Sequence, residues 1–382
     1  MTVVPLKVPI LKIPFDQQDA DQISGELTRM LLEGRLAMGP MVARFEEEFR
    51  RFIGTDYACG CSNGTAALEM IFRALQVQGG SVAIPANTFM ATAMAALAAG
   101  AKIILVDSEP HDFQMSADDL AAKIRPDTKA VVLVHVGGFI SPHWRRIKQI
   151  ASQNRAAFIE DAAHAHGSEI DGLKAGALGL AGAFSFFPTK VLTTAEGGMV
   201  TTSEAWFFER LLTLRQHGQS KPGSNIHESF GLNFRPSEIH ALLGLRLMAK
   251  ANWIVEQRRR AAAVYDRLLE HGPVIPIKPV PGLKPSYYKY MALLPPGVER
   301  SVVKERVRNN YGVALAGEVY ATAGNLQPLW STNQEYLAAP LTRLPVLEEL
   351  APRQICLPIW PGLSDDDQSY VVESLVKVLE GL

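Results

Sequence analysis

The chain has 382 residues, of which 47% are hydrophobic and 20% are charged, and its formal net charge at pH 7 is −1. This length allows a large domain with a smaller one attached, and the composition is that of a globular protein. The near-neutral charge argues against nucleic acid or an anionic membrane as the main partner, because neutralising phosphates requires an excess of lysine and arginine.

The first residues and the cysteines indicate where the protein works. The segment "MTVVPLKVPILKIPF" is apolar but interrupted by prolines and lysines, which is typical of neither a signal peptide nor a membrane span. Cys59, Cys61 and Cys356 are odd in number and lack metal-ligand spacing. We interpret them as buried thiols, and we expect a cytoplasmic location and no metal site.

Two helices and then a sheet are predicted in the first part of the chain. Residues 20–34 and 40–54 carry apolar residues at intervals of three and four, and each segment ends at a glycine. From residue 57 short apolar strands alternate with helices, at "YACGCS", "SVAIPA", "KIILVD", "AVVLVHV", "AAFIEDA", "GAFSFF" and "GGMVTT". Strands without alternating polar residues predict an α/β fold, with a mainly parallel seven-stranded sheet between helices.

A smaller domain is predicted after the sheet. A long helical stretch extends from about Arg235 to His271, and the proline-rich "GPVIPIKPVPG" ends it. Beyond it lie a strand-like "YYKYMALLP", a helix at "SVVKERVRNNYG" and a closing helix at "SDDDQSYVVESLVKVLEGL". We therefore assign residues 1–271 to a large α/β domain and residues 272–382 to a small C-terminal α+β domain.

Several candidate residues follow predicted strands, at the rim where doubly wound sheets bind ligands. Gly64 and Thr65 lie where a strand turns into a helix, so their backbone N–H groups either hold a phosphate or only form a tight turn. Asp161 ends a strand and either pairs with a cationic ring nitrogen or caps a helix. Lys190 is either a solvated lysine or a nucleophile in a dry pocket.

Other residues near the same rim allow two interpretations each. Ser185 is either a buried hydroxyl or an anion ligand, and Phe89 either joins the core or lies against a flat heteroaromatic ring. His164 and His166 could be simple polar residues of a turn. An anion cradle, a carboxylate, an aromatic ring and a nucleophilic lysine in this chain order together fit pyridoxal 5′-phosphate.

Nine segments carry a family resemblance. In chain order they are "SNGTAAL", "NTFMATA", "VDSEP", "VHVGG", "IEDAAHAHG", "FSFFPTK", "EGGMVTT", "LRQHG" and "GLNFRPSEIHALLGLRL". Together they closely resemble the DegT/DnrJ/EryC1/StrS family of pyridoxal-phosphate-dependent sugar aminotransferases of fold type I. The resemblance runs from about residue 20 to 270 and continues more weakly to "CLPIWPGLSDDD".

The resemblance implies a reaction. An amino group would pass from an amino acid, expected to be L-glutamate, to a ketosugar, expected to be a nucleotide-linked deoxy-ketosugar. The setting would be amino-sugar, polysaccharide or natural-product biosynthesis. Lys190 would form a Schiff base with the cofactor and move the proton, Asp161 would pair with the pyridine nitrogen, and His164 would lie near the phenolic oxygen of the cofactor ring.

The resemblance also implies the rest of the cofactor site. Two ring-face residues and four phosphate ligands are expected: Phe89, Ala163, Gly64, Thr65, Ser185 and Asn233. Asn233 would reach the phosphate of the neighbouring subunit, which makes a homodimer with shared sites the expected assembly. Arg215 and His217 are candidates for substrate contact, although they could equally be surface residues of a flexible loop.

Two departures from the family pattern leave the amino acceptor open. Leu180 stands where relatives commonly carry an acidic residue, and "EVYATAGNLQPLW" lacks a histidine often seen in the substrate-facing loop. A cyclitol or an aminoshikimate-type ketone is the alternative acceptor. A sugar dehydratase of the same family would carry histidine in place of Lys190, and a non-catalytic regulator or carbohydrate-binding protein would not need the complete site.

Overall fold

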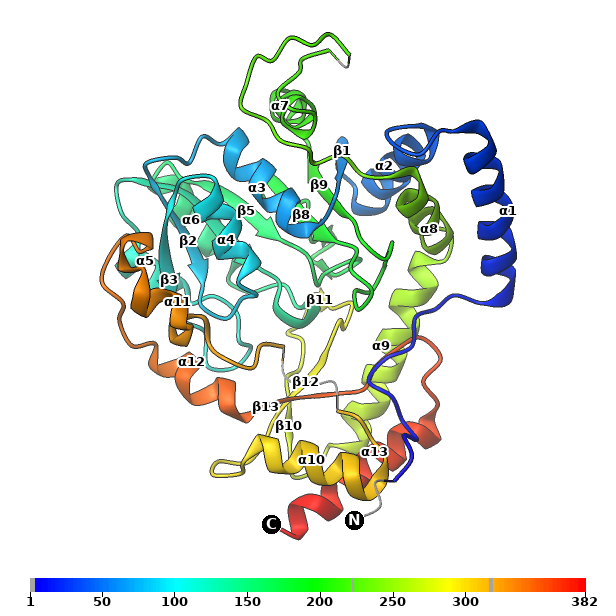
Figure 1. Ribbon diagram of the computed structural model, residues 1–382. Helices are drawn as coiled ribbons and strands as arrows, with labels where there is room; N and C mark the ends of the chain where they lie inside the picture. Colours follow the sequence, from blue (N-terminus) through cyan, green and yellow to red (C-terminus); the bar gives the residue numbers. More distant parts are fainter. Residues whose placement is uncertain (1–3, 222, 316–318) are drawn as a thin grey trace.

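The computed structural model describes residues 4–221, 223–315 and 319–382. Within these residues, seven strands form a central sheet in the order β1-β9-β8-β5-β4-β2-β3 (Figure 1). The strands are β1 (Tyr57–Cys61), β2 (Ser81–Pro85), β3 (Lys102–Val106), β4 (Thr128–Val134), β5 (Ala157–Asp161), β8 (Ala181–Ser185) and β9 (Gly198–Thr202). The predicted α/β class and the mainly parallel sheet are confirmed.

The direction of the strands places their carboxyl ends at a common rim. Neighbouring strands from β8 to β3 pair in parallel, whereas β9 runs antiparallel to both β1 and β8. Every residue of β2 and β9 is buried, which explains why the strands have continuous apolar sequences rather than alternating ones. The helices that follow strands of the sheet are α3 (Gly64–Ala74), α4 (Ala91–Ala98), α5 (Ala117–Lys123), α6 (Trp144–Gln153) and α7 (Ala205–Arg215), with η1 (Val136–Gly138) after β4.

The two predicted N-terminal helices are present as α1 (Gln17–Glu33) and α2 (Pro40–Ile53). Gly34 and Gly54 follow them with φ of 71° and 89°, the left-handed conformation that glycine adopts without steric cost. Helix α2 packs its apolar face against β1 and against α8 (Glu238–Met248).

The long helical stretch expected near residues 235–271 is two helices. α8 ends at Met248 and α9 runs from Ala251 to Leu268. Between them Lys250 leaves helical geometry, with φ of −124°, and its ammonium pairs with Asp19 of α1. The side chain of Ser237 caps α8 by accepting from the amide of His240 at 3.1 Å.

Two small sheets lie outside the central sheet, and the second combines one C-terminal strand with two strands from between β5 and β8. One contains β10 (Ile275–Pro276), β12 (Tyr290–Leu293) and β13 (Gln354–Leu357), and the other contains β6 (Glu169–Ile170), β7 (Leu173–Lys174) and β11 (Leu283–Lys284). The remaining helices are α10 (Arg300–Tyr311), α11 (Pro328–Thr332), α12 (Pro345–Leu350) and α13 (Asp365–Glu380), with η2 (Gly324–Leu326), η3 (Gln334–Tyr336) and η4 (Ala351–Arg353). Helix α13 packs on both α9 and α10 (Figure 1). The division between residues 271 and 272 stays a prediction.

The cysteines and the helices bear on the expected location. Cys59, Cys61 and Cys356 are buried and unbridged, as the sequence predicted. Among the residues that the structure describes, none of the helices combines the length and apolar character needed to cross a membrane.

Candidate active site

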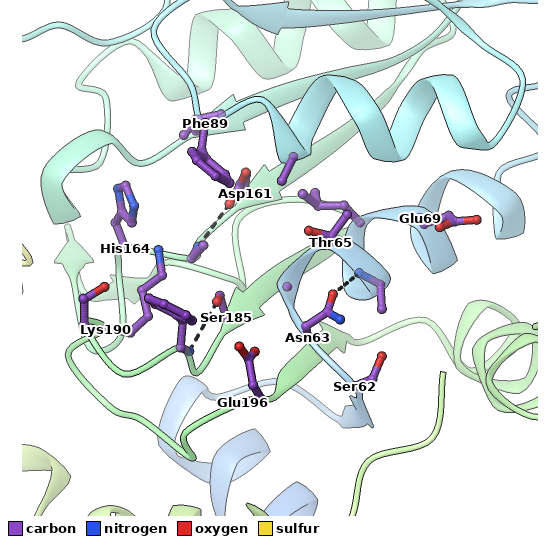
Figure 2. Close-up of a pocket in the computed structure, with 18 of the residues that line it drawn as sticks. Ser62, Asn63, Thr65, Glu69, Phe89, Asp161, His164, Ser185, Lys190 and Glu196 are labelled. Carbon is purple, nitrogen blue, oxygen red and sulfur yellow. Dashed lines mark hydrogen bonds between the residues drawn. The ribbon is translucent and has the colours of Figure 1, made fainter. Parts of the chain in front are cut away.

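A cavity of about 830 Å³ lies at the carboxyl-end rim of the sheet. Figure 2 shows Lys190, His164 and Asp161 around one side of it, and Asn63 and Thr65 around the other. All nine residues expected to bind the cofactor line this cavity: Gly64, Thr65, Phe89, Asp161, Ala163, His164, Ser185, Lys190 and Asn233. The fold thus gathers residues that are far apart in the sequence.

One end of the cavity is built to hold an anion. Helix α3 begins at Gly64, and the side chain of Asn63 caps it by accepting from the amide of Ala66 at 2.8 Å. The amides of Gly64 and Thr65 lie in the first turn, where no carbonyl of the helix can accept from them. A Cβ atom at Gly64 would lie 2.7 Å from the Cβ of Ser185, so only glycine lets α3 start so close to β8. These donors and the helix dipole together favour a phosphate.

Asp161 is held firmly in the cavity wall. It ends β5, and its side chain is almost entirely buried. One carboxylate oxygen accepts from the hydroxyl of Thr92 at 2.8 Å, and the other accepts from the amide of Ala163 at 3.2 Å. The hydroxyls of Thr92 and Thr88 lie 2.7 Å apart. A carboxylate fixed in this way suits a cationic ring nitrogen.

Lys190 has the surroundings of a reactive amine. It follows β8, and its backbone amide donates to the carbonyl of Phe187 at 2.9 Å. Burial lowers the pKa of Lys190, and the ammonium of Lys289 acts in the same direction, while Tyr288 and Asp161 oppose them. A lower pKa increases the fraction of unprotonated, nucleophilic amine at neutral pH.

His164 faces two tyrosines that the sequence did not reveal. Its ring stacks on Tyr288 with centroids 4.1 Å apart, and Tyr320 stacks at 6.0 Å. Burial holds the pKa of His164 well below its usual value, so the ring is neutral at physiological pH. Its Nδ1 is buried without a hydrogen-bond partner among the described residues, which leaves it available to a ligand.

His166 and Phe89 differ in their surroundings. His166 is completely buried between Phe184 and Phe186, so it belongs to the core rather than to a solvated turn. Phe89 lines the cavity and 66% of it is exposed, although it lies beside the buried strands. An exposed ring at a cavity is available to stack on a flat ligand. The ring-face roles of Phe89 and Ala163 stay predictions.

Arg215, His217 and Asn233 differ in how they lie relative to the cavity. Arg215 is 7% exposed, forms an ion pair with Glu46 at 2.6 Å, and donates to the carbonyl of Gly60. Arg215 and the exposed His217 are not among the residues found to line the cavity. Asn233 lines the cavity of its own chain, and its reach to a neighbouring subunit stays a prediction.

Several lining residues were missed by sequence reasoning. Asn63 could have been found, because an asparagine before a predicted helix is a typical cap. Tyr288 and Tyr320 come from the C-terminal part and carry no local signal. Glu196, in the turn before β9, also lines the cavity with an exposed side chain, and no hydrogen bond or ion pair joins its carboxylate to the described residues. The two departures from the family pattern are at Leu180 and in "EVYATAGNLQPLW". Among the described residues, neither forms a hydrogen bond with Asp161 or Lys190. Glu318, which begins the second segment, lies outside the described residues.

Comparison with known proteins identifies the class of this site. The sequence model of the DegT/DnrJ/EryC1/StrS aminotransferase family matches residues 17–376. The chain therefore belongs to this family of aminotransferases, as the sequence motifs predicted.

Individual relatives and a solved structure are similar to nearly the whole chain. The chain is 30% identical to the dTDP-3-amino-3,4,6-trideoxy-alpha-D-glucose transaminase of Micromonospora megalomicea subsp. nigra, over 97% of this chain and 98% of that protein. It is 32% identical to a "Pleiotropic regulatory protein" of Geobacillus stearothermophilus, again over 97% of this chain and 98% of that protein. Among solved structures, S. venezuelae DesV, which was crystallised with a ketimine intermediate, matches with a TM-score of 0.87 and 27% identity over 98% of each chain.

Proposed function

We propose that the protein is a pyridoxal-phosphate-dependent aminotransferase that moves an amino group from an amino acid to a ketosugar. L-Glutamate is the expected donor, and a nucleotide-linked deoxy-ketosugar is the expected acceptor. The observation that carries the proposal is that one cavity holds Lys190, Asp161 and the anion cradle at Gly64. Membership of the aminotransferase family supports it.

The residues of the cavity fit the proposed cofactor. The anion cradle matches its phosphate, the fixed carboxylate of Asp161 matches its pyridine nitrogen, and the amine of Lys190 matches its aldehyde. The exposed ring of Phe89 is an apolar surface that a bound heteroaromatic ring would cover, and His164 Nδ1 is a buried atom beside the cavity without a hydrogen-bond partner among the described residues. When bound, pyridoxal phosphate supplies an electron sink and carries the amino group.

Asp161 has a binding role in the proposed reaction, and Lys190 has a proton-transfer role. Asp161 would hold the ring nitrogen and favour its protonated form, because Thr92 and Ala163 fix the two carboxylate oxygens. Lys190 Nζ would accept the proton from the α-carbon of the amino acid and would deliver it to C4′ of the bound cofactor. The same amine performs the reverse transfer at the carbonyl carbon of the acceptor. Burial favours this cycle because it lowers the pKa of Lys190 and so increases the fraction of unprotonated amine.

Two observations support a sugar as the acceptor. One relative is a GDP-perosamine synthase of Escherichia coli O157:H7, 31% identical over 88% of this chain and 90% of that protein, and its name denotes an amino-sugar product. The exposed carboxylate of Glu196 in the cavity, which has no partner among the described residues, can accept hydrogen bonds from the hydroxyls of a sugar or a cyclitol. The aminoshikimate-type or cyclitol ketone therefore stays the alternative acceptor.

Lys190 argues against both a dehydratase and a non-catalytic regulator. The resemblance predicts histidine in place of Lys190 in a dehydratase, and a regulator does not require a nucleophilic amine. The relative named as a regulatory protein carries a name that states no reaction, so it does not decide the matter.

We further propose a cytoplasmic homodimer whose sites are shared through Asn233. Ile226, Phe230 and Leu232 precede Asn233 and are 63%, 74% and 37% exposed, which is more apolar surface than a solvated loop needs. Mixed dimers test this arrangement. Lys190→Ala and Asn233→Asp subunits should each be inactive alone, and mixing them should restore up to about a quarter of the activity, since one site of each mixed dimer then contains both native residues. No restoration after verified subunit exchange would contradict the shared site.

Lys190→Ala tests the reaction itself. Turnover with L-glutamate and a panel of nucleotide-linked ketosugars should be abolished, while the variant should still bind the cofactor noncovalently through the anion cradle and Asp161. Lys102→Ala, at the exposed start of β3, is a matched control that should keep full turnover. Normal turnover by the Lys190→Ala variant would overturn the proposal.

A further inference from the structure

Tyr288 contacts three groups of the active site. Its hydroxyl lies 3.1 Å from the hydroxyl of Thr189, the residue before Lys190. The Nζ of Lys190 lies 4.9 Å from the centroid of the Tyr288 ring. The ring of His164 stacks on the same tyrosine at 4.1 Å with an interplanar angle of 22°. One side chain from the segment before β12 therefore meets three neighbours on the large sheet.

The backbone that carries Tyr288 is held in an unusual conformation. Tyr287 has φ of +49°, in the left-handed region that bulky residues rarely adopt. The buried guanidinium of Arg258 donates to the carbonyl of Tyr287 at 2.8 Å, and the amide of Ser286 donates to the hydroxyl of Ser168 at 2.9 Å. Such conformations persist where surrounding contacts enforce them, and they are common at functional sites.

A second set of contacts ties this segment to the loop that carries His164. The hydroxyl of Ser286 donates to the carbonyl of His164 at 3.2 Å, and the amide of Lys289 donates to the carbonyl of Gly137 at 3.1 Å. These hydrogen bonds therefore hold the segment that carries Tyr288 in one position relative to the rim of the sheet.

We propose that Tyr288 is a positioning residue for Lys190, whose ring face holds the amine and whose hydroxyl fixes Thr189. This inference rests on the proposed role of Lys190 in the reaction. The face of an aromatic ring attracts a cation within about 6 Å of its centroid, so the ring stabilises the protonated amine and limits its directions of swing. The bond to Thr189 restrains the backbone immediately before Lys190.

Other charged and titratable groups also act on Lys190. Asp161 favours its protonated form, whereas Lys289 disfavours it. His164 and His166 also interact with Lys190, and burial lowers the pKa of both histidines. Leucine at position 288 removes the ring and the hydroxyl together, including the contact of the ring with Lys289 Nζ at 5.1 Å, whereas phenylalanine removes the hydroxyl alone.

The experiment measures the reactivity of Lys190 in the cofactor-free full-length protein. A water-soluble amine-acylating reagent is applied at a series of pH values, and the rate of modification of Lys190 is followed by peptide mass mapping. Tyr288→Leu keeps an apolar wall but removes the ring, so the apparent pKa of Lys190 should fall by about half a unit to one unit. Tyr288→Phe keeps the ring and removes only the hydroxyl, so the apparent pKa should shift less than in Tyr288→Leu.

The Tm of each variant shows whether it is folded, and Tyr288→Met is a second ring-free variant if leucine is not tolerated. A ring-free variant that is folded and has the wild-type pH profile would overturn the proposal, and so would an equal shift in Tyr288→Phe. Because the assay contains neither cofactor nor substrate, its failure would be distinct from a failure of the proposed aminotransferase reaction.

Discussion

The hydroxyl of Thr92 donates a hydrogen bond to the carboxylate of Asp161 at 2.8 Å, and this bond joins helix α4 to the end of strand β5. Thr92 is 1% exposed and Asp161 is 7% exposed, so the bond is formed away from bulk water. A buried carboxylate that is to face a cationic ring nitrogen needs donors that fix its direction, and Thr92 is one of the two that the structure provides.

Thr92→Val should weaken binding of pyridoxal phosphate about tenfold, which is about 1.4 kcal/mol, because it removes a hydrogen bond to a charged group without changing the shape of the side chain. The dissociation constant can be measured by fluorescence titration of the cofactor-free protein. Thr88→Val, which lies one hydrogen bond further from Asp161, should have a smaller effect. An equal loss in both variants would argue against the specific role of Thr92.

Gly64→Ala tests the anion cradle. The new methyl group would meet Ser185 at 2.7 Å, so α3 must move away from β8 and the phosphate donors must separate. Affinity for pyridoxal phosphate should fall at least tenfold, whereas affinity for pyridoxal, which has no phosphate, should change little. Gly25→Ala is the control, because a Cβ there meets nothing within 4 Å and alanine favours the helix. Equal losses for both ligands would show that the cradle does not hold the phosphate.

His166→Phe tests the effect of a buried neutral ring on stability. Burial lowers the pKa of His166 to about 3, whereas the unfolded chain binds a proton near pH 6.5. The contribution of His166 to the free energy of unfolding is therefore fully present above pH 6.5. It is lost as the pH falls toward 3, by up to about 1.4 kcal/mol per pH unit. Phenylalanine suits the aromatic surroundings of Phe184 and Phe186 and does not titrate.

Urea unfolding of wild type and of His166→Phe between pH 7 and pH 4 measures this difference. The free energy of unfolding should fall less steeply in the variant, and some slope should remain because burial also lowers the pKa of His164. Parallel pH profiles would show that His166 does not titrate in this way.

Arg215→Ala distinguishes a structural arginine from a substrate ligand. The substitution leaves the partly buried Glu46 without its ion-pair partner, so the free energy of unfolding should fall by about 2 kcal/mol, less than for a fully buried pair. Replacing both Arg215 and Glu46 with methionine should recover part of this loss, because no unpaired charge then remains. If Arg215→Ala keeps its stability and changes only the KM for one substrate, the original expectation of substrate contact is correct.

Much of the large sheet could be predicted because its strands are buried on both faces and have continuous apolar sequences. The same signal could not show that β9 runs antiparallel, since strand direction leaves no mark on a fully buried pattern. Nor could helical periodicity reveal the break at Lys250, which depends on a long-range pairing with Asp19.

The candidate site was predictable where a residue directly follows a strand. Asp161 is paired with Ala183 of β8, so Lys190, which follows β8, reaches the same rim. Tyr288 and Tyr320 were not predictable, because the C-terminal part brings them to the rim through contacts that have no sequence periodicity. Arg215 was a candidate either for substrate contact or for a surface residue of a flexible loop, and its burial beside Glu46 of α2 and Gly60 of β1 depends on long-range packing that leaves no local signal.

The central claim is that Lys190 bonds covalently to pyridoxal phosphate, and borohydride reduction of the cofactor-loaded protein tests it most directly. After digestion, mass mapping should locate the reduced pyridoxyl group on the peptide that contains Lys190 and nowhere else in stoichiometric amount. An unlabelled Lys190, or stoichiometric label on another lysine such as Lys289, would contradict the account.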